Sequence, residues 1–96
     1  MLNAMDRERA AGVAVRALGF IAGDSERLGV FLASCGAEAE DLRRQARDPA
    51  FLGFVLDFLL MEDESVLAFA SEAGLDPHDV AAARRALPGG DVPEWT

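Results

Sequence analysis

Lysine and tyrosine are absent from this chain of 96 residues, and cysteine and histidine occur once each. The single cysteine, Cys35, excludes a disulfide within the chain. The single histidine, His78, means that every Ser-His-Asp, Cys-His or histidine-based metal arrangement would depend on one side chain. We therefore expect no catalytic residues, no metal ligands and no bound cofactor.

Long apolar runs and nucleotide-binding glycine motifs are also missing. No stretch reaches the ~20 apolar residues of a membrane-spanning helix, and the N-terminal residues carry charge where a signal peptide is apolar. The glycines form neither a phosphate-binding loop nor a dinucleotide fingerprint. These absences predict a cytoplasmic protein that binds neither a membrane nor a nucleotide.

Basic residues are few, because nine arginines stand against seventeen acidic residues and the net charge is −8. Such a charge repels nucleic-acid phosphates and anionic lipids, so neither is favoured as a partner. The hydrophobic fraction of 51% is that of a folded protein. A chain of this length has room for one domain, and we expect a single helical domain over residues 1–96.

Apolar residues recur at helical spacing, and strand-like alternation is nearly absent. The pattern predicts an all-α fold, a compact bundle of about six short helices over residues 5–22, 24–35, 38–46, 49–61, 64–73 and 77–86. We expect these helices to begin at capping side chains, namely Asn3, Asp24, Asp48, Asp63 and Asp76. Residues 1–4 should be a flexible N-terminus. Residues 88–96 should be a non-helical tail packed on the bundle and anchored by Trp95.

The sequence also resembles itself at an offset of 38 residues. The matched positions include buried-stripe residues, such as Phe31 with Phe69, and a helix-ending glycine, Gly36 with Gly74. These matches are sparse, yet they fall where a repeated three-helix unit would need them. They indicate two related three-helix halves that pack face to face.

The segment 51–61 is the most apolar of the chain, with nine apolar side chains among its eleven. On a helical wheel these side chains cover an arc of roughly 260°, far wider than the stripe of an ordinary surface helix. We expect this helix to lie at the centre of the bundle and to be covered completely. If it is not covered, the exposed patch should bind a second copy or a partner protein.

Asp57 is the one charged residue in this segment, and it shares the remaining wedge of the wheel with Gly53 and Ala50. Three interpretations stay open: a solvent-facing or cap-bonding side chain, a buried hydrogen-bonding carboxylate, or a functional carboxylate. Asp57 is therefore a candidate residue of interest.

A glycine-containing turn between residues 64–73 and 77–86 fits the spacing of a helix-turn-helix motif. The would-be recognition helix begins with Asp76, His78 and Asp79, which are poor readers of bases and phosphates. Two arginines, Arg84 and Arg85, are the remaining candidates for phosphate contacts. A DNA-binding regulator is therefore an alternative interpretation, ranked below a structural helical corner.

Several local motifs resemble a family of short, all-helical alphaproteobacterial proteins catalogued as a domain of unknown function. The resemblance covers about residues 10–96 and is carried by Leu18-Gly19-Phe20-Ile21, the run from Asp48-Pro49 to Val55-Leu56-Asp57-Phe58-Leu59-Leu60, Asp63-Glu64, Leu87-Pro88-Gly89-Gly90 and Pro93-x-Trp95. It implies a compact all-helical fold and a cytoplasmic location, and it implies no activity. By elimination, we expect a non-enzymatic protein-interaction or regulatory adaptor whose partner is another protein, with a monomer favoured over a homodimer.

Overall fold

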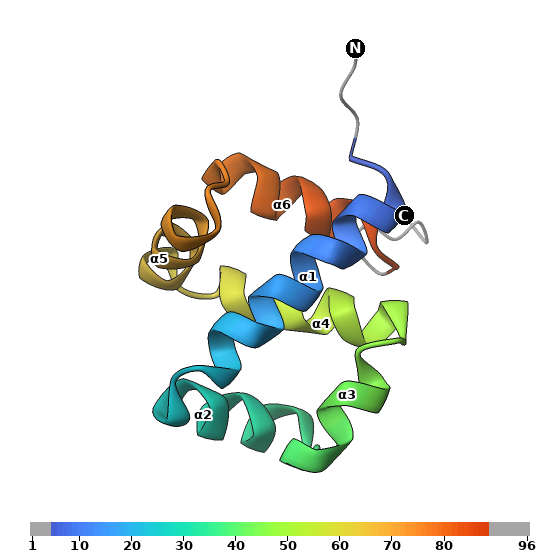
Figure 1. Cartoon of the computed structure of the whole chain (residues 1–96), viewed down its shortest axis with the longest axis vertical. Coiled ribbons are helices and arrows are strands. Elements are labelled where there is room, and N and C mark those ends of the chain that lie inside the picture. Colours follow the sequence, from blue (N-terminus) through green and yellow to red (C-terminus); the bar gives the residue numbers. More distant parts are fainter. Residues whose placement is uncertain (1–4, 89–96) are drawn as a thin grey trace, which may run out of the picture.

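Residues 5–88, which a computed structural model describes, form six α-helices and one 3₁₀ turn (Figure 1). In chain order these are α1 (Arg7–Ala22), α2 (Ser25–Cys35), the 3₁₀ turn η1 (Ala39–Asp41), α3 (Leu42–Gln45), α4 (Pro49–Leu60), α5 (Asp63–Ala73) and α6 (Pro77–Ala86). No strand occurs among these residues, so the predicted all-α fold is confirmed. The expectations for residues 1–4 and for the tail with Trp95 concern residues outside the described range, except at Pro88.

Aspartate side chains cap most of the helices. Asp24, Asp48 and Asp76 accept hydrogen bonds from backbone N–H groups of the first turns of α2, α4 and α6, as predicted. Asn3 lies outside the described residues, and the cap of α1 is Asp6, which accepts from Arg9 N at 2.7 Å. The prediction for the fifth helix is wrong by one residue, because α5 begins at Asp63 and its N-cap residue is Glu62.

The offset of 38 residues is visible in the helix boundaries. Both α2 and α5 are 11 residues long, and their first residues, Ser25 and Asp63, lie 38 positions apart. Each ends at a left-handed glycine, Gly36 with φ 70° and Gly74 with φ 71°, a conformation that a side chain would strain. The second helix of each half therefore repeats in length and in its glycine stop as well as in sequence.

The third helices of the two halves differ. The predicted helix over residues 38–46 is instead the 3₁₀ turn η1 followed by the four-residue α3, whereas α6 has 10 residues. The N-cap residue of η1, Glu38, makes no side-chain capping bond, and Leu42 is the one buried residue of η1 and α3. A short helix depends on a packed apolar face, which this segment does not have.

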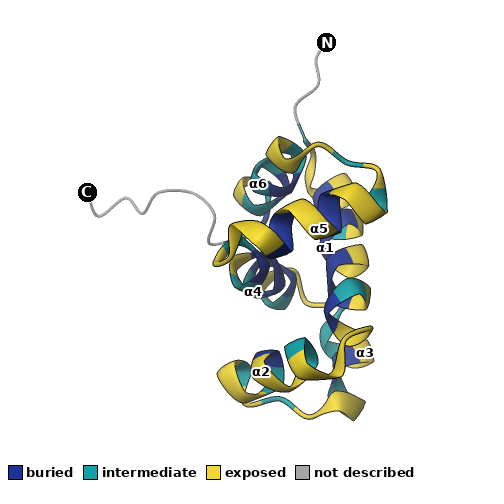
Figure 2. Ribbon diagram, turned by 90° about the vertical axis from the view of Figure 1, so that its left-hand side faces the viewer, coloured by how far each residue is buried: buried dark blue, intermediate teal, exposed yellow. Residues whose placement is uncertain are grey.

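The core lies mainly where α1, α4 and α6 meet. Two pictures of the chain show α5 beside these helices and α2 with α3 at the other end of the molecule (Figures 1 and 2). The radius of gyration, 12.9 Å, is close to the ~13 Å of a compact domain of 100 residues. The predicted compact bundle is thus confirmed, with α1 as the helix that packs on α2, α4, α5 and α6.

The expectation that segment 51–61 is completely covered is wrong, although α4 does lie at the centre of the bundle, in contact with α1, α5 and α6. α1 buries six residues and shares the centre with α4. Among the apolar side chains of segment 51–61, Phe58 is half-buried and Met61 is 78% exposed. Met61 follows the last helical residue of α4, where the chain turns toward α5, so no neighbouring helix reaches over it.

Phe31 connects α2 to the rest of the bundle. Its ring is fully buried and lies 5.1–5.9 Å, centroid to centroid, from the rings of three residues of α4: Phe51, Phe54 and Phe58. Two of these pairs are edge-to-face, a favoured geometry for aromatic rings. The backbones of α2 and α4 do not pack closely, so side chains rather than adjacent helix surfaces join α2 to α4.

Replacing Phe31 by alanine should therefore lower the free energy of unfolding by about 3–5 kcal/mol, the usual cost of truncating a buried aromatic residue. Urea denaturation followed by circular dichroism measures the effect. The neighbouring Val30 is 57% exposed, and Val30→Ala should change stability by no more than about 0.5 kcal/mol. Equal effects of the two substitutions would contradict the assigned role of Phe31.

Candidate functional site

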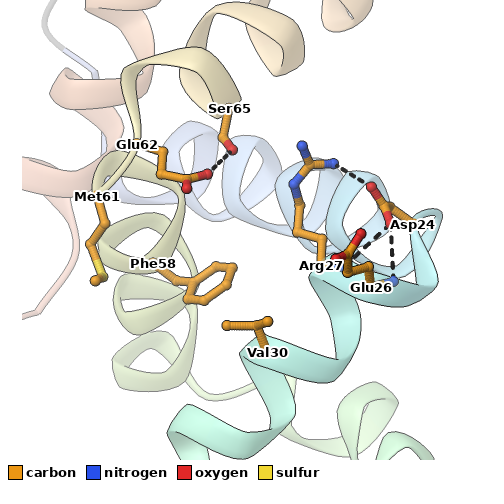
Figure 3. Close-up of a pocket in the computed structure, with 8 residues that line it drawn as sticks. All are labelled: Asp24, Glu26, Arg27, Val30, Phe58, Met61, Glu62 and Ser65. Atoms are coloured by element: carbon orange, nitrogen blue, oxygen red, sulfur yellow. Dashed lines mark hydrogen bonds and ion pairs between the residues drawn. The ribbon is translucent and has the colours of Figure 1, made fainter.

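A groove of about 390 Å³ lies between α2 and the corner that joins α4 to α5 (Figure 3). Eight residues line it: Asp24, Glu26, Arg27, Val30, Phe58, Met61, Glu62 and Ser65. The first four come from the start of α2, and the others come from the end of α4 and the start of α5. The groove is open because Phe31 joins α2 to α4 through aromatic rings and not through close backbone packing.

The middle of the groove is apolar. Val30 from α2 and Phe58 from α4 point toward each other, and Met61 lines the groove at the end of α4 with its side chain turned away from Val30 (Figure 3). Val30 is 57% exposed and Met61 is 78% exposed. Of the four large hydrophobic side chains that are exposed in residues 5–88, two therefore line the same groove.

Carboxylates stand on both walls of the groove. Asp24 and Glu26 lie on the α2 side, and Glu62 lies on the opposite side. Glu62 is oriented by a hydrogen bond that the buried Ser65 hydroxyl donates to its Oε1 at 2.9 Å. Within the described part of the chain, neither Glu26 nor Glu62 forms an ion pair.

The one basic residue that lines the groove is already engaged by its neighbours. Arg27 Nη1 lies 3.2 Å from Asp24 Oδ2, and the Arg27 guanidinium lies 4.7 Å from the centroid of the Phe20 ring. Arg27 therefore balances Asp24 and leaves two uncompensated carboxylates at the groove, Glu26 and Glu62. These charges favour a cationic ligand.

The arrangement suits binding better than catalysis. No histidine, cysteine or lysine lines the groove, so activation of the Ser65 hydroxyl would fall to Glu62 alone, and no further group orients this carboxylate as a base. His78 lies at the exposed start of α6. Among residues 5–88, no cluster of three or more His, Cys, Asp or Glu side chains could hold a metal ion.

No helix in the described range is long and apolar enough to cross a membrane.

A second, smaller hollow of about 240 Å³ lies between α1 and α5. Its basic residue, Arg16, donates a hydrogen bond to the carbonyl oxygen of Ala73 at 2.9 Å, at the C-terminal end of α5. A cation at that end of a helix stabilises the unpaired carbonyl groups. Arg16 therefore has a structural role, because it stabilises the end of α5. We take the larger groove as the candidate site.

Two of the sequence-selected residues, Asp57 and Arg84, meet each other away from this groove. Arg84 Nε donates to Asp57 Oδ1 at 2.5 Å, and Arg84 Nη2 donates to Asp57 Oδ2 at 3.0 Å. This two-point geometry is the strongest form of an arginine–carboxylate pair. The Arg84 side chain is 14% exposed and the Asp57 side chain is 52% exposed, so the pair lies at the edge of the core and joins α6 to α4. Asp57 is therefore exposed, which contradicts the interpretation of it as a buried carboxylate, and its carboxylate is bonded to Arg84.

Gly53 makes this pair possible, and the sequence interpretation missed it. A Cβ atom at Gly53 would lie 2.7 Å from Arg84 Nη1 and 3.1 Å from the carbonyl oxygen of Pro88. Arg84 Nη1 also donates to that carbonyl at 3.0 Å, so the guanidinium fills the space above Gly53. A glycine one helical turn before Asp57, in the same polar wedge, is the signal that could have indicated a close neighbour.

Arg85, the third candidate, is exposed and takes no part in this pair. The two arginines of α6 therefore differ, because Arg84 is bound to Asp57 whereas Arg85 faces solvent. A phosphate contact by Arg84 would require its separation from Asp57. The geometry thus weakens the helix-turn-helix interpretation of α5 and α6.

One comparison with known proteins finds a family that matches most of the chain. The family described as "Protein of unknown function (DUF3572)" matches residues 7–90. The chain belongs to this family. The resemblance seen in the sequence is confirmed at the level of a domain of unknown function, and the alphaproteobacterial origin stays a prediction. No curated protein and no solved structure matches this DUF3572 member with significant similarity.

The substitution Gly53→Ala tests the space that Arg84 occupies. Alanine in a helix interior is normally more favourable than glycine by about 0.5–1 kcal/mol. At position 53 we expect the opposite sign, a loss of about 1–3 kcal/mol, because the new methyl group displaces the guanidinium. Thermal and urea unfolding measure the difference.

Gly12→Ala in α1 is the matched control, since a Cβ there meets no atom within 4 Å, and it should stabilise the protein. In a background of Arg84→Ala, Gly53→Ala should cost less, because the clash with the guanidinium is gone and only the Pro88 carbonyl oxygen, at 3.1 Å, remains close. A Gly53→Ala protein as stable as Gly12→Ala would disprove the assigned role of Gly53.

Proposed function

We propose that this protein is a non-enzymatic adaptor that binds another protein in the groove between α2 and the α4–α5 corner, in a bacterial cytoplasm. The observation that carries the proposal is the pair of exposed apolar side chains, Val30 and Met61, in one groove beside half-buried Phe58. Apolar side chains gathered in a concave surface and bordered by polar groups are typical of protein-binding sites.

A partner protein fits this surface better than a second copy of the chain. Two copies would each bring a net charge of −8. A symmetric contact through the groove would also place Glu26 and Glu62 of one copy near the same residues of the other, and such like charges repel. We therefore favour a monomer that binds a different protein.

DNA binding through α5 and α6 is the weaker alternative. The start of α6 presents Asp76 and Asp79, whose carboxylates accept hydrogen bonds within the capping box. Arg84 is held by Asp57, which leaves Arg85 as the exposed arginine of the helix. No observation favours this alternative over the groove.

Site-specific crosslinking in cells of the native host tests the proposal. A photoreactive amino acid in place of Met61 should crosslink to a partner protein, whereas the same amino acid in place of Leu67 should not. Leu67 is a matched control because it is 57% exposed and apolar but does not line the groove.

The crosslinked protein is then identified by mass spectrometry, purified and titrated with the adaptor. Val30→Ser should weaken this binding about tenfold, through the loss of about two buried carbon groups from the contact, and Leu67→Ser should leave it unchanged. Crosslinks of equal yield from positions 61 and 67, or none from position 61, would refute the proposed site.

A further inference from the structure

The two sides of the groove carry charge of the same sign. Glu26 stands on the α2 side and Glu62 on the α4–α5 side, and the apolar side chains of Val30 and Phe58 face each other across the groove (Figure 3). Asp63 and Glu64 follow Glu62 directly and are also exposed. A ligand in the groove therefore meets at least one carboxylate at each wall.

Few ligands match this order of charges. An amphipathic helix has a single apolar stripe, and in a basic amphipathic helix lysine or arginine residues border that stripe on both sides. Such a helix can place apolar anchors, three or four residues apart, against Val30 and Phe58 and its basic residues beside Glu26 and Glu62. We infer that the groove binds a basic amphipathic helix of the partner protein, an inference that rests on the proposed adaptor function.

The chain itself does not supply this ligand within the described residues. One of its arginine pairs, Arg43-Arg44, lies in the four-residue α3, which is too short to present an apolar stripe. Arg44 is also paired with Asp41 at 3.0 Å. The other pair, Arg84-Arg85, lies in α6, where Arg84 is bound to Asp57. The occupant is therefore a helix of a different protein and not a helix of a second copy.

Synthetic peptides test the inference with the full-length protein. The probe is a fluorescent 18-residue peptide whose leucines recur at helical spacing on a background of lysine. Two reference peptides are compared with it. The first has the same leucine pattern with glutamate in place of lysine. The second has the same leucine and lysine content in an order that destroys the apolar stripe. Fluorescence anisotropy should show binding of the first peptide, no binding of the glutamate peptide, and binding of the reordered peptide that is about tenfold weaker, as expected when apolar anchors are lost.

Two charge variants with the same net charge separate the groove from the overall acidity of the protein. Glu26→Gln with Glu62→Gln should weaken the lysine peptide about 2- to 30-fold, as expected for the loss of two surface ion pairs. The amide oxygen that this variant carries at position 62 can still accept the hydrogen bond from Ser65. Glu8→Gln with Glu40→Gln, at exposed positions that do not line the groove, should have a much smaller effect.

The peptide results decide the inference separately from the adaptor proposal. Equal weakening by the two charge variants, or equal binding of the lysine and glutamate peptides, would overturn the basic helix as ligand. The adaptor proposal would still stand if a partner crosslinks from position 61 through an acidic or uncharged segment, and it falls if position 61 yields no crosslink. Selective binding of the lysine peptide, together with a crosslink that maps to a basic helix of the partner, supports both.

Discussion

The arrangement of this molecule depends on the contact between the ring of Phe31 and three phenyl rings of α4. Because this contact is made by side chains, α2 is joined to the bundle without lying directly against α4. Residues next to Phe31 and its ring partner Phe58, in particular Val30 and Met61, are consequently left in a groove. The same aromatic cluster thus stabilises one end of the fold and creates the surface to which we assign the function.

Local features of the sequence were enough to predict most helix boundaries. Asp48-Pro49 and Asp76-Pro77 begin α4 and α6, and Gly36 and Gly74 end α2 and α5. Each signal acts through the residue itself or its next few neighbours, so no knowledge of the tertiary fold is needed. The prediction of one helix over residues 38–46 failed. This segment is weakly apolar, so a longer helix would need packing against the core, and Leu42 is the one residue that is buried there.

Long-range contacts were less accessible from the sequence. The helical wheel correctly separated Asp57 and Gly53 from the apolar arc of α4, but it could not show that Arg84, 27 residues from Asp57, covers this wedge. The width of the arc was likewise correctly interpreted as a need for several neighbours, which are α1, α5, α6 and the ring of Phe31. The position of the uncovered end was not predictable, because it depends on where α5 turns away after Met61.

The two features built around α4 have different physical roles, and their exposure separates them. Arg84 is largely buried, and its guanidinium fills the space above Gly53, so changes at this pair act on the stability of the contact between α4 and α6. Val30 and Met61 are mostly exposed, and polar substitutions at such positions generally change stability by less than about 0.5 kcal/mol. The fold that presents the groove is stabilised by Phe31 and by the core of α1, α4 and α6. A loss of binding caused by a substitution in the groove can therefore be attributed to the lost contact with the partner.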